Sequence, residues 1–199
     1  MEQILPEEKL NQLKEIKGGV RGLSLKSDGG FILKERGEDG LAELEKAMAG
    51  LGYPIKYQEL DALSYYPIAL KAITLEVVKE LFGFKEDDFI RMGDFGSKIS
   101  FIRELLIKYF FSFERFMKEI PKVWNEYYTV GELEVAEYNK QEQYIRGRLK
   151  GFALTPLECQ YLKGFFINVL SMMIKDEMTC EETKCIHQGD EYHEFLVKW

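Results

Sequence analysis

The sequence predicts an α+β fold in which an N-terminal helical layer packs on a twisted antiparallel sheet of about four strands. Apolar residues recur at helical spacing through much of residues 1–128, and strict alternation replaces this period after residue 129. One amphipathic helix then separates two pairs of strands, so the C-terminal order is β-β-α-β-β. We expect the mainly helical residues 1–128 and the strand-rich residues 129–199 to form one compact domain.

Composition limits the class of protein. The net charge of −7 argues against a nucleic-acid partner, because phosphate binding needs a basic surface. The N-terminus is charged throughout, unlike a secretory signal, and the longest apolar run, residues 164–174, is too short to span a membrane. An odd count of three cysteines fits a reducing compartment better than disulfides. We therefore expect a cytoplasmic protein.

The helical half divides at its glycines and prolines. Residues 6–17 are expected to form an amphipathic helix, and residues 18–30 are glycine-rich and read as irregular, without the Gly-Lys-Ser/Thr ending of a phosphate loop. Further helices are expected at residues 38–49, as two short helices within 61–83, and as a turn at 85–92 that ends in a bend at 93–96. Residues 100–128 form the longest helical stretch, which Pro121 kinks or ends.

The strand half begins with two alternating segments, residues 131–139 and 143–152, joined by a short turn. Residues 155–174 return to helical spacing. Thr155 is the expected N-cap, Pro156 takes the first helical position, and Glu158 stands three residues after the cap, as in a capping box. The chain closes with a hairpin of residues 177–186 and 192–199.

The closing hairpin carries both histidines and two of the three cysteines. Alternation puts His193 on the more apolar face of the last strand. A three-residue turn at 188–190, with Gly189 at positive φ, would place Cys185 opposite His193, whereas a two-residue turn would separate them. On a regular strand Cys180 would face away from Cys185, so Cys180 and His187 are left outside the candidate site.

Cys159 begins the apolar stripe of the preceding helix, so Cys159, Cys185 and His193 are candidate zinc ligands. The alternative is an ordinary buried contact between cysteine and histidine. The carboxylates nearby, Glu181 and Glu182 among them, are interpreted as solvated strand residues. With no catalytic set evident, an enzyme is the less favoured class.

A ligand cavity is the second candidate site. Its expected lining is Tyr109, Phe110, Phe113, Phe116, Tyr144, Arg148 and Phe166. The aromatic rings could equally be plain core, and "YIRGR" could be a solvated basic edge instead of a grip for a carboxylate or phosphate. Haem is disfavoured, because an axial histidine is usually on a helix and no histidine precedes residue 187.

The segments "LECQYLKGFF" and "DEMTCEETKCIHQGDEYHEFLVKW" resemble the four-vinyl reductase (hydrocarbon-binding) domain. The matching positions are Cys159, Cys185, Gly189, Asp190, His193 and Phe195, with His193 where the family usually has cysteine. This domain is part of a ligand-binding superfamily shared with haem nitric-oxide sensors, whose Tyr-x-Ser-x-Arg motif has Arg146 in place of serine here, and with Golgi transport-particle subunits.

The resemblance implies a homodimer with an apolar cavity for a small hydrophobic molecule. The function it implies is a sensor or carrier, with a regulatory protein as partner. Two alternatives remain: a transport-particle-like scaffold that binds only proteins, and a haem-binding gas sensor.

Overall fold

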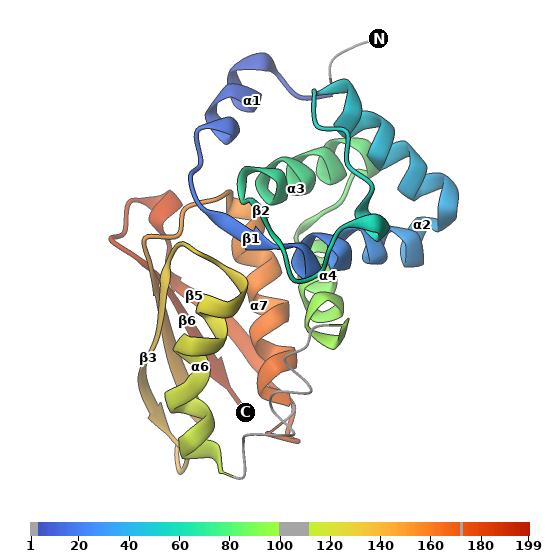
Figure 1. Ribbon diagram of the computed structural model, residues 1–199. Coiled ribbons are helices and arrows are strands. Elements are labelled where there is room, and N and C mark those ends of the chain that lie inside the picture. Colours follow the sequence, from blue (N-terminus) through green and yellow to red (C-terminus); the bar gives the residue numbers. More distant parts are fainter. Residues whose placement is uncertain (1–3, 100–111, 172) are drawn as a thin grey trace.

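The computed structural model of the protein describes residues 4–99, 112–171 and 173–199 (Figure 1). The first part of the chain is helical, with one small sheet. Its elements are α1 (Glu7–Lys14), β1 (Gly19–Arg21), α2 (Gly22–Gly50), the 3-10 turn η1 (Tyr57–Glu59), β2 (Tyr65–Pro67), α3 (Ala69–Phe82) and α4 (Glu86–Ile99). Strands β1 and β2 pair antiparallel.

The second part of the chain builds the main sheet. Its elements are α6 (Phe113–Tyr127), β3 (Glu132–Asn139), β4 (Tyr144–Lys150), α7 (Pro156–Ser171), β5 (Thr179–Lys184), the 3-10 turn η2 (Ile186–Gln188) and β6 (His193–Lys198). The four strands lie in the order β3-β4-β6-β5, and every neighbouring pair is antiparallel. The α+β prediction, including the β-β-α-β-β order at the C-terminus, is confirmed.

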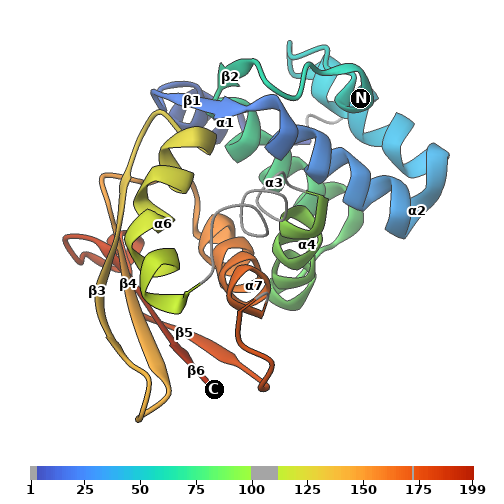
Figure 2. The ribbon, with the colours of Figure 1, turned by 60° about the horizontal axis from the view of Figure 1, so that its bottom comes forward.

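The elements stack in layers (Figure 2). Helices α6 and α7 cover one face of the sheet, and α4, α3 and α2 lie beyond them. Apolar side chains of all these layers form one continuous core. Within the described residues, no helix combines the length and the apolar character needed to cross a membrane.

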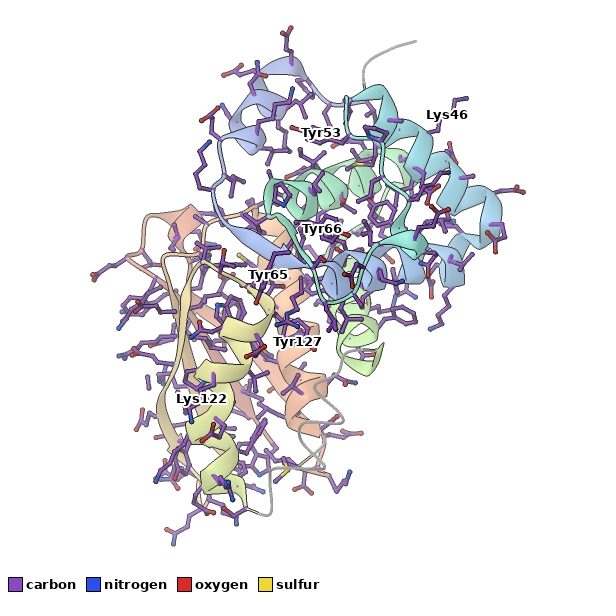
Figure 3. All side chains as sticks on the ribbon, in the orientation of Figure 1. Lys46, Tyr53, Tyr65, Tyr66, Lys122 and Tyr127 are labelled. Atoms are coloured by element: carbon purple, nitrogen blue, oxygen red, sulfur yellow. The ribbon has the colours of Figure 1, made fainter. Side chains whose placement is uncertain are left out.

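Hydrogen bonds also join the small sheet to the C-terminal end of α6. Val20 of β1 pairs with Tyr128, just after α6, and the Thr129 backbone N–H donates to the Gly19 carbonyl at 3.0 Å. Tyr65 of β2 donates its hydroxyl to the Glu126 carbonyl at 3.0 Å, and Figure 3 shows Tyr65 beside the end of α6 that carries Tyr127. The helical part and the sheet part are thus hydrogen-bonded as well as packed.

Two glycine-rich segments are helical, contrary to the prediction. Residues 22–30 are the start of α2, and α4 runs through the expected bend at 93–96. These glycines serve close packing: a Cβ at Gly93 would lie 1.9 Å from the Tyr161 carbonyl oxygen, and one at Gly29 would lie 2.3 Å from the Tyr57 Cβ. A glycine at a helix crossing and a glycine that ends a helix look alike in a sequence.

The other predicted helices agree only in part with the structure. The two short helices expected within residues 61–83 are one strand, β2, and one helix, α3, which Gly83 ends at φ 65° as expected. The helix expected at 38–49 is the second half of α2, beyond a non-helical Gly37. Helix α6 continues through Pro121 to Tyr127, and the Ser112 hydroxyl caps its start.

Candidate functional site

A bulge in β5 decides which side chains face the helices. The pairing with β6 shifts between Glu182 and Lys184, so Thr183 is the extra residue. Because of this shift, Cys180, Glu182 and Cys185 all point to the buried face of the sheet. The expectation that Cys180 faces away from Cys185 is therefore wrong, although Cys180 packs against the core and stays outside the cluster described next.

The connection between β5 and β6 is longer than the expected three-residue turn. It contains η2, and Gly189 follows at φ 98°, so the positive φ predicted for this glycine is confirmed. The Asp190 carboxylate accepts a hydrogen bond from the Cys185 N–H at 2.8 Å, and the Asp190 N–H donates back to the Cys185 carbonyl at 3.2 Å. This reciprocal pair positions Cys185 at the end of β5.

Four side chains meet where α7 begins and β5 ends: Cys159, Glu182, Cys185 and His193, with all ligand atoms within 4.8 Å of one another. The Cys159 sulfur lies 3.9 Å from the Cys185 sulfur and 3.7 Å from His193 Nδ1. His193 Nδ1 lies 2.9 Å from Glu182 Oε1. The structure thus brings together the three candidate ligands that the sequence indicated and adds Glu182.

The two distances from the Cys159 sulfur match the edges of a zinc tetrahedron, whereas the 2.9 Å between His193 Nδ1 and Glu182 Oε1 is shorter than the expected edge of about 3.3 Å. With Zn–S bonds of about 2.3 Å and Zn–N bonds of about 2.0 Å, two sulfurs lie about 3.8 Å apart, and sulfur and nitrogen about 3.5 Å apart. His193 Nε2 donates to the Phe152 carbonyl at 2.8 Å. Because a carbonyl only accepts, Nε2 carries a hydrogen. Nδ1 donates to the Glu182 carboxylate, and on metal binding it would give up that hydrogen and present its lone pair, as in metal sites with an outer hydrogen-bonded carbonyl.

The surroundings of the cluster raise the pKa of both thiols and lower the pKa of the carboxyl group. Burial, and next the Glu182 charge, raise the pKa of Cys159 well above its usual range. Burial also raises the pKa of Cys185, followed by its hydrogen bond to Glu182. Burial would raise the pKa of Glu182, but hydrogen bonds from His193, Cys185 and Cys159 outweigh it and lower that pKa. Metal binding would therefore release protons from the thiols.

An apolar cavity of about 70 Å³ lies between α6, α7 and the sheet. Its lining is formed by side chains of all three, among them Phe116, Val123, Trp124, Leu133, Val135, Ile145, Phe165, Phe166, Leu170 and Phe195. Gly147 also lines it, and a Cβ there would meet nothing nearer than the Glu134 carbonyl oxygen at 3.9 Å. The cavity wall therefore has room at Gly147.

The residues expected to line a cavity are divided by the structure. Phe116 and Phe166 line it. Phe113 lies at the start of α6 and packs on Tyr138 and Trp199 instead. Tyr109 and Phe110 lie outside the described residues.

Tyr144 and Arg148 lie on the opposite face of the sheet from the cavity. Ile145 of β4 faces the core and is only 4% exposed. Because side chains alternate along a strand, Tyr144, Arg146 and Arg148 face the other way. On the outer face, Arg146 and Arg148 each donate to the Glu194 carboxylate at 2.8 Å. Burial would raise the pKa of Glu194, but hydrogen bonds from Arg148, Thr183 and Arg146 lower it to about 2. The arginines of "YIRGR" are thus paired within the sheet.

No protein-family model and no curated protein matches the chain. Its fold resembles that of an H-NOX protein from S. oneidensis in the Fe(II)NO ligation state, at 12% identity over 89% of this chain and 98% of that chain, with a TM-score of 0.66. A Tt H-NOX variant gives 15% identity over 90% and 94% of the two chains and a TM-score of 0.64. A mutant H-NOX from K. algicida, in the Fe(II) unliganded state, gives 11% identity over 89% and 95%, with a TM-score of 0.61.

At these identities the likeness establishes a shared fold. The resemblance to the four-vinyl reductase family is not supported by any matching family model.

The described residues do not fit a haem in this cavity. Of the side chains that ligate haem iron, only Tyr127 and Tyr128 line it within the described part of the chain, and the chain has no histidine before residue 187. Burial, and next the Glu158 charge, raise the pKa of Tyr128 well above its usual range, which disfavours a phenolate ligand. The volume is also below the about 300 Å³ of a typical cofactor pocket.

Proposed function

We propose that the protein is a ligand-binding sensor or carrier that takes a small apolar molecule into the cavity between α6, α7 and the sheet. The observation that carries this proposal is the apolar cavity itself. The solved structures with a similar fold include an H-NOX protein in an Fe(II)NO ligation state, which is a protein with a small bound ligand. A cavity of about 150 Å³ holds benzene or xenon. At about 70 Å³ this one suits a molecule of very few heavy atoms, and a larger ligand needs its walls to move.

Xenon titration followed by NMR tests this proposal. We expect saturable shifts confined to residues around the cavity in the native chain. Gly147→Val should abolish them, because the new side chain enters the cavity without a backbone clash. Lys150→Val, on the exposed end of the same strand, is the matched control and should leave them unchanged.

Two other outcomes support the alternative functions. Absence of xenon shifts in the native chain would contradict the proposal and favour a scaffold with a filled core. Stoichiometric haem uptake, seen as a sharp Soret band that Gly147→Val removes, would favour the gas sensor.

We also propose that Cys159, Glu182, Cys185 and His193 hold one zinc ion. Four protein ligands make a closed site, which in zinc proteins is structural, whereas catalytic sites keep a position open. Zinc would fasten the start of α7 to the β5–β6 hairpin. Four protein ligands would fill the tetrahedral coordination of the zinc and leave no position for a water nucleophile. The proposed site therefore favours a structural clip over a hydrolase.

Metal content tests the clip. Protein purified without chelators should contain about one zinc per chain. Cys185→Ser should lose it, whereas Cys180→Ser, which removes the cysteine outside the cluster, should keep it. A native chain without zinc would contradict the proposed site.

A further inference from the structure

Two consecutive residues in the first turn of α7 face different parts of the molecule. Cys159 belongs to the candidate zinc site. Glu158 points toward the helical part, where its Oε2 lies 3.8 Å from the Lys71 ammonium of α3. The expected capping-box role of Glu158 is therefore wrong, and its carboxyl is instead only 2% exposed.

Glu158 enters a buried group of charges without a hydrogen bond of its own. Lys71 is fully buried, binds the equally buried Asp28 of α2 at 3.1 and 3.2 Å, and lies 3.7 Å above the Tyr161 ring. Among the described residues, neither oxygen of Glu158 has a hydrogen-bond partner. A buried polar group left without a partner is costly, and a charge-assisted bond to Lys71 would need a separation of about 2.8 Å.

We infer that Glu158 couples the zinc site to the buried Lys71–Asp28 pair, so that zinc binding and the Glu158–Lys71 hydrogen bond compete. This inference rests on the zinc site proposed above. In this inference the first turn of α7 has two positions. One completes the metal site, and the other lets Glu158 form a hydrogen bond with Lys71.

The direction of the effect follows from the distances. The Cys159 sulfur already lies at zinc-ligand spacing from Cys185 and His193, whereas Glu158 Oε2 stands about 1 Å too far from the Lys71 ammonium for a charge-assisted bond. A shift of the first turn toward α3 would satisfy Glu158 and move Cys159 with it. Each chain in the shifted state is unavailable to zinc, which lowers the apparent affinity by the fraction that is shifted.

Zinc affinity, measured by competition with a chromophoric chelator, tests the coupling. We expect Glu158→Leu to bind zinc at least fivefold more tightly than the native chain, and Glu158→Gln to change the affinity in the same direction. Tyr57→Phe is the matched control. It removes a buried hydrogen bond to Thr74 in the same helical part, at 2.6 Å, without touching α7, and its affinity should stay within twofold of native.

Hydrogen exchange supplies a second readout. Because coupling is reciprocal, zinc should lower amide protection around Asp28 in α2 and Lys71 in α3 of the native chain, relative to the rest of the fold, and this relative loss should be absent in Glu158→Leu. Unchanged affinity in both Glu158 variants, or an equal gain in Tyr57→Phe, would overturn the coupling while the zinc site stands. A native chain that binds no zinc would remove both the site and the coupling.

Discussion

At the scale of single residues, Glu182 is the most informative side chain of the candidate site. Its carboxylate lies 2.9 Å from His193 Nδ1 and belongs to the four-ligand group. If it binds zinc, Glu182→Ala should weaken zinc affinity at least about tenfold, since even outer hydrogen-bonding partners of metal ligands contribute about that much. Glu181→Ala, at the exposed neighbouring position, is the control, and chelator competition is the measurement.

The opposite result has a clear meaning. Equal zinc affinity in Glu181→Ala and Glu182→Ala would show that the metal uses only the two thiolates and the imidazole. The fourth position would then be open, and the class of zinc enzyme would return as an explanation.

The sequence indicated Cys159, Cys185 and His193, but not Glu182. Alternation alone puts Cys185 and Glu182 on opposite faces, and only the extra residue Thr183 turns both inward. A bulge has no clear signature within "TCEETK". The three soft ligands could be found because their residue types are rare in this chain, whereas a glutamate among 34 acidic residues could not.

At the scale of elements, the crossing of α4 and α7 depends on glycines. A Cβ at Gly164 would lie 1.9 Å from the Ile90 carbonyl oxygen, and one at Gly93 equally close to that of Tyr161. Gly164→Ala should therefore push the helices apart and lower the free energy of unfolding by about 3 kcal/mol. Urea denaturation measures this loss.

Gly50→Ala is the control for that experiment, because a Cβ at the end of α2 meets nothing within 4 Å. It should change the free energy of unfolding by less than about 1 kcal/mol. Equal effects of the two substitutions would show that the crossing tolerates a wider separation of the helices.

The same glycines explain why strands were easier to predict than helices. Strands β3, β4 and β6 follow an alternating pattern that has few other readings. Gly93 and Gly96 were interpreted as a bend because glycine disfavours helices in isolation. Their contact with α7, more than sixty residues later in the chain, is a tertiary fact that no local pattern contains.

At the scale of the whole molecule, α7 is the shared element of both sites. It supplies Cys159 to the candidate metal site and Phe166 to the cavity, and it separates the sheet from the helical part (Figure 2). Any ligand that moves α7 would therefore alter the packing of this helix against both the sheet and the helical part. The expected homodimer and regulatory partner stay predictions, and sedimentation of the chain would test the homodimer first.

The buried tyrosines predict how the fold responds to alkali. Burial raises the pKa of Tyr57, Tyr128 and Tyr161 far above their usual range. An unfolded tyrosine ionises near pH 10, while the folded one keeps its proton, so the native state binds more protons and stability falls as the pH rises above about 10. Three such groups give a slope of up to about 4 kcal/mol per pH unit.

Two variants separate ionisation from hydrogen bonding in this effect. Tyr57→Phe should lower stability at neutral pH by about 1 kcal/mol, through loss of its bond to Thr74, and reduce the alkaline slope by about a third. Thr74→Val loses the same bond but keeps the phenol, so its slope should match the native chain. Urea denaturation between pH 9 and 11 measures both quantities. A stability that stays flat across this range would mean that the phenols reach water without global unfolding, through an opening of the helical layer around Tyr57 and Tyr161.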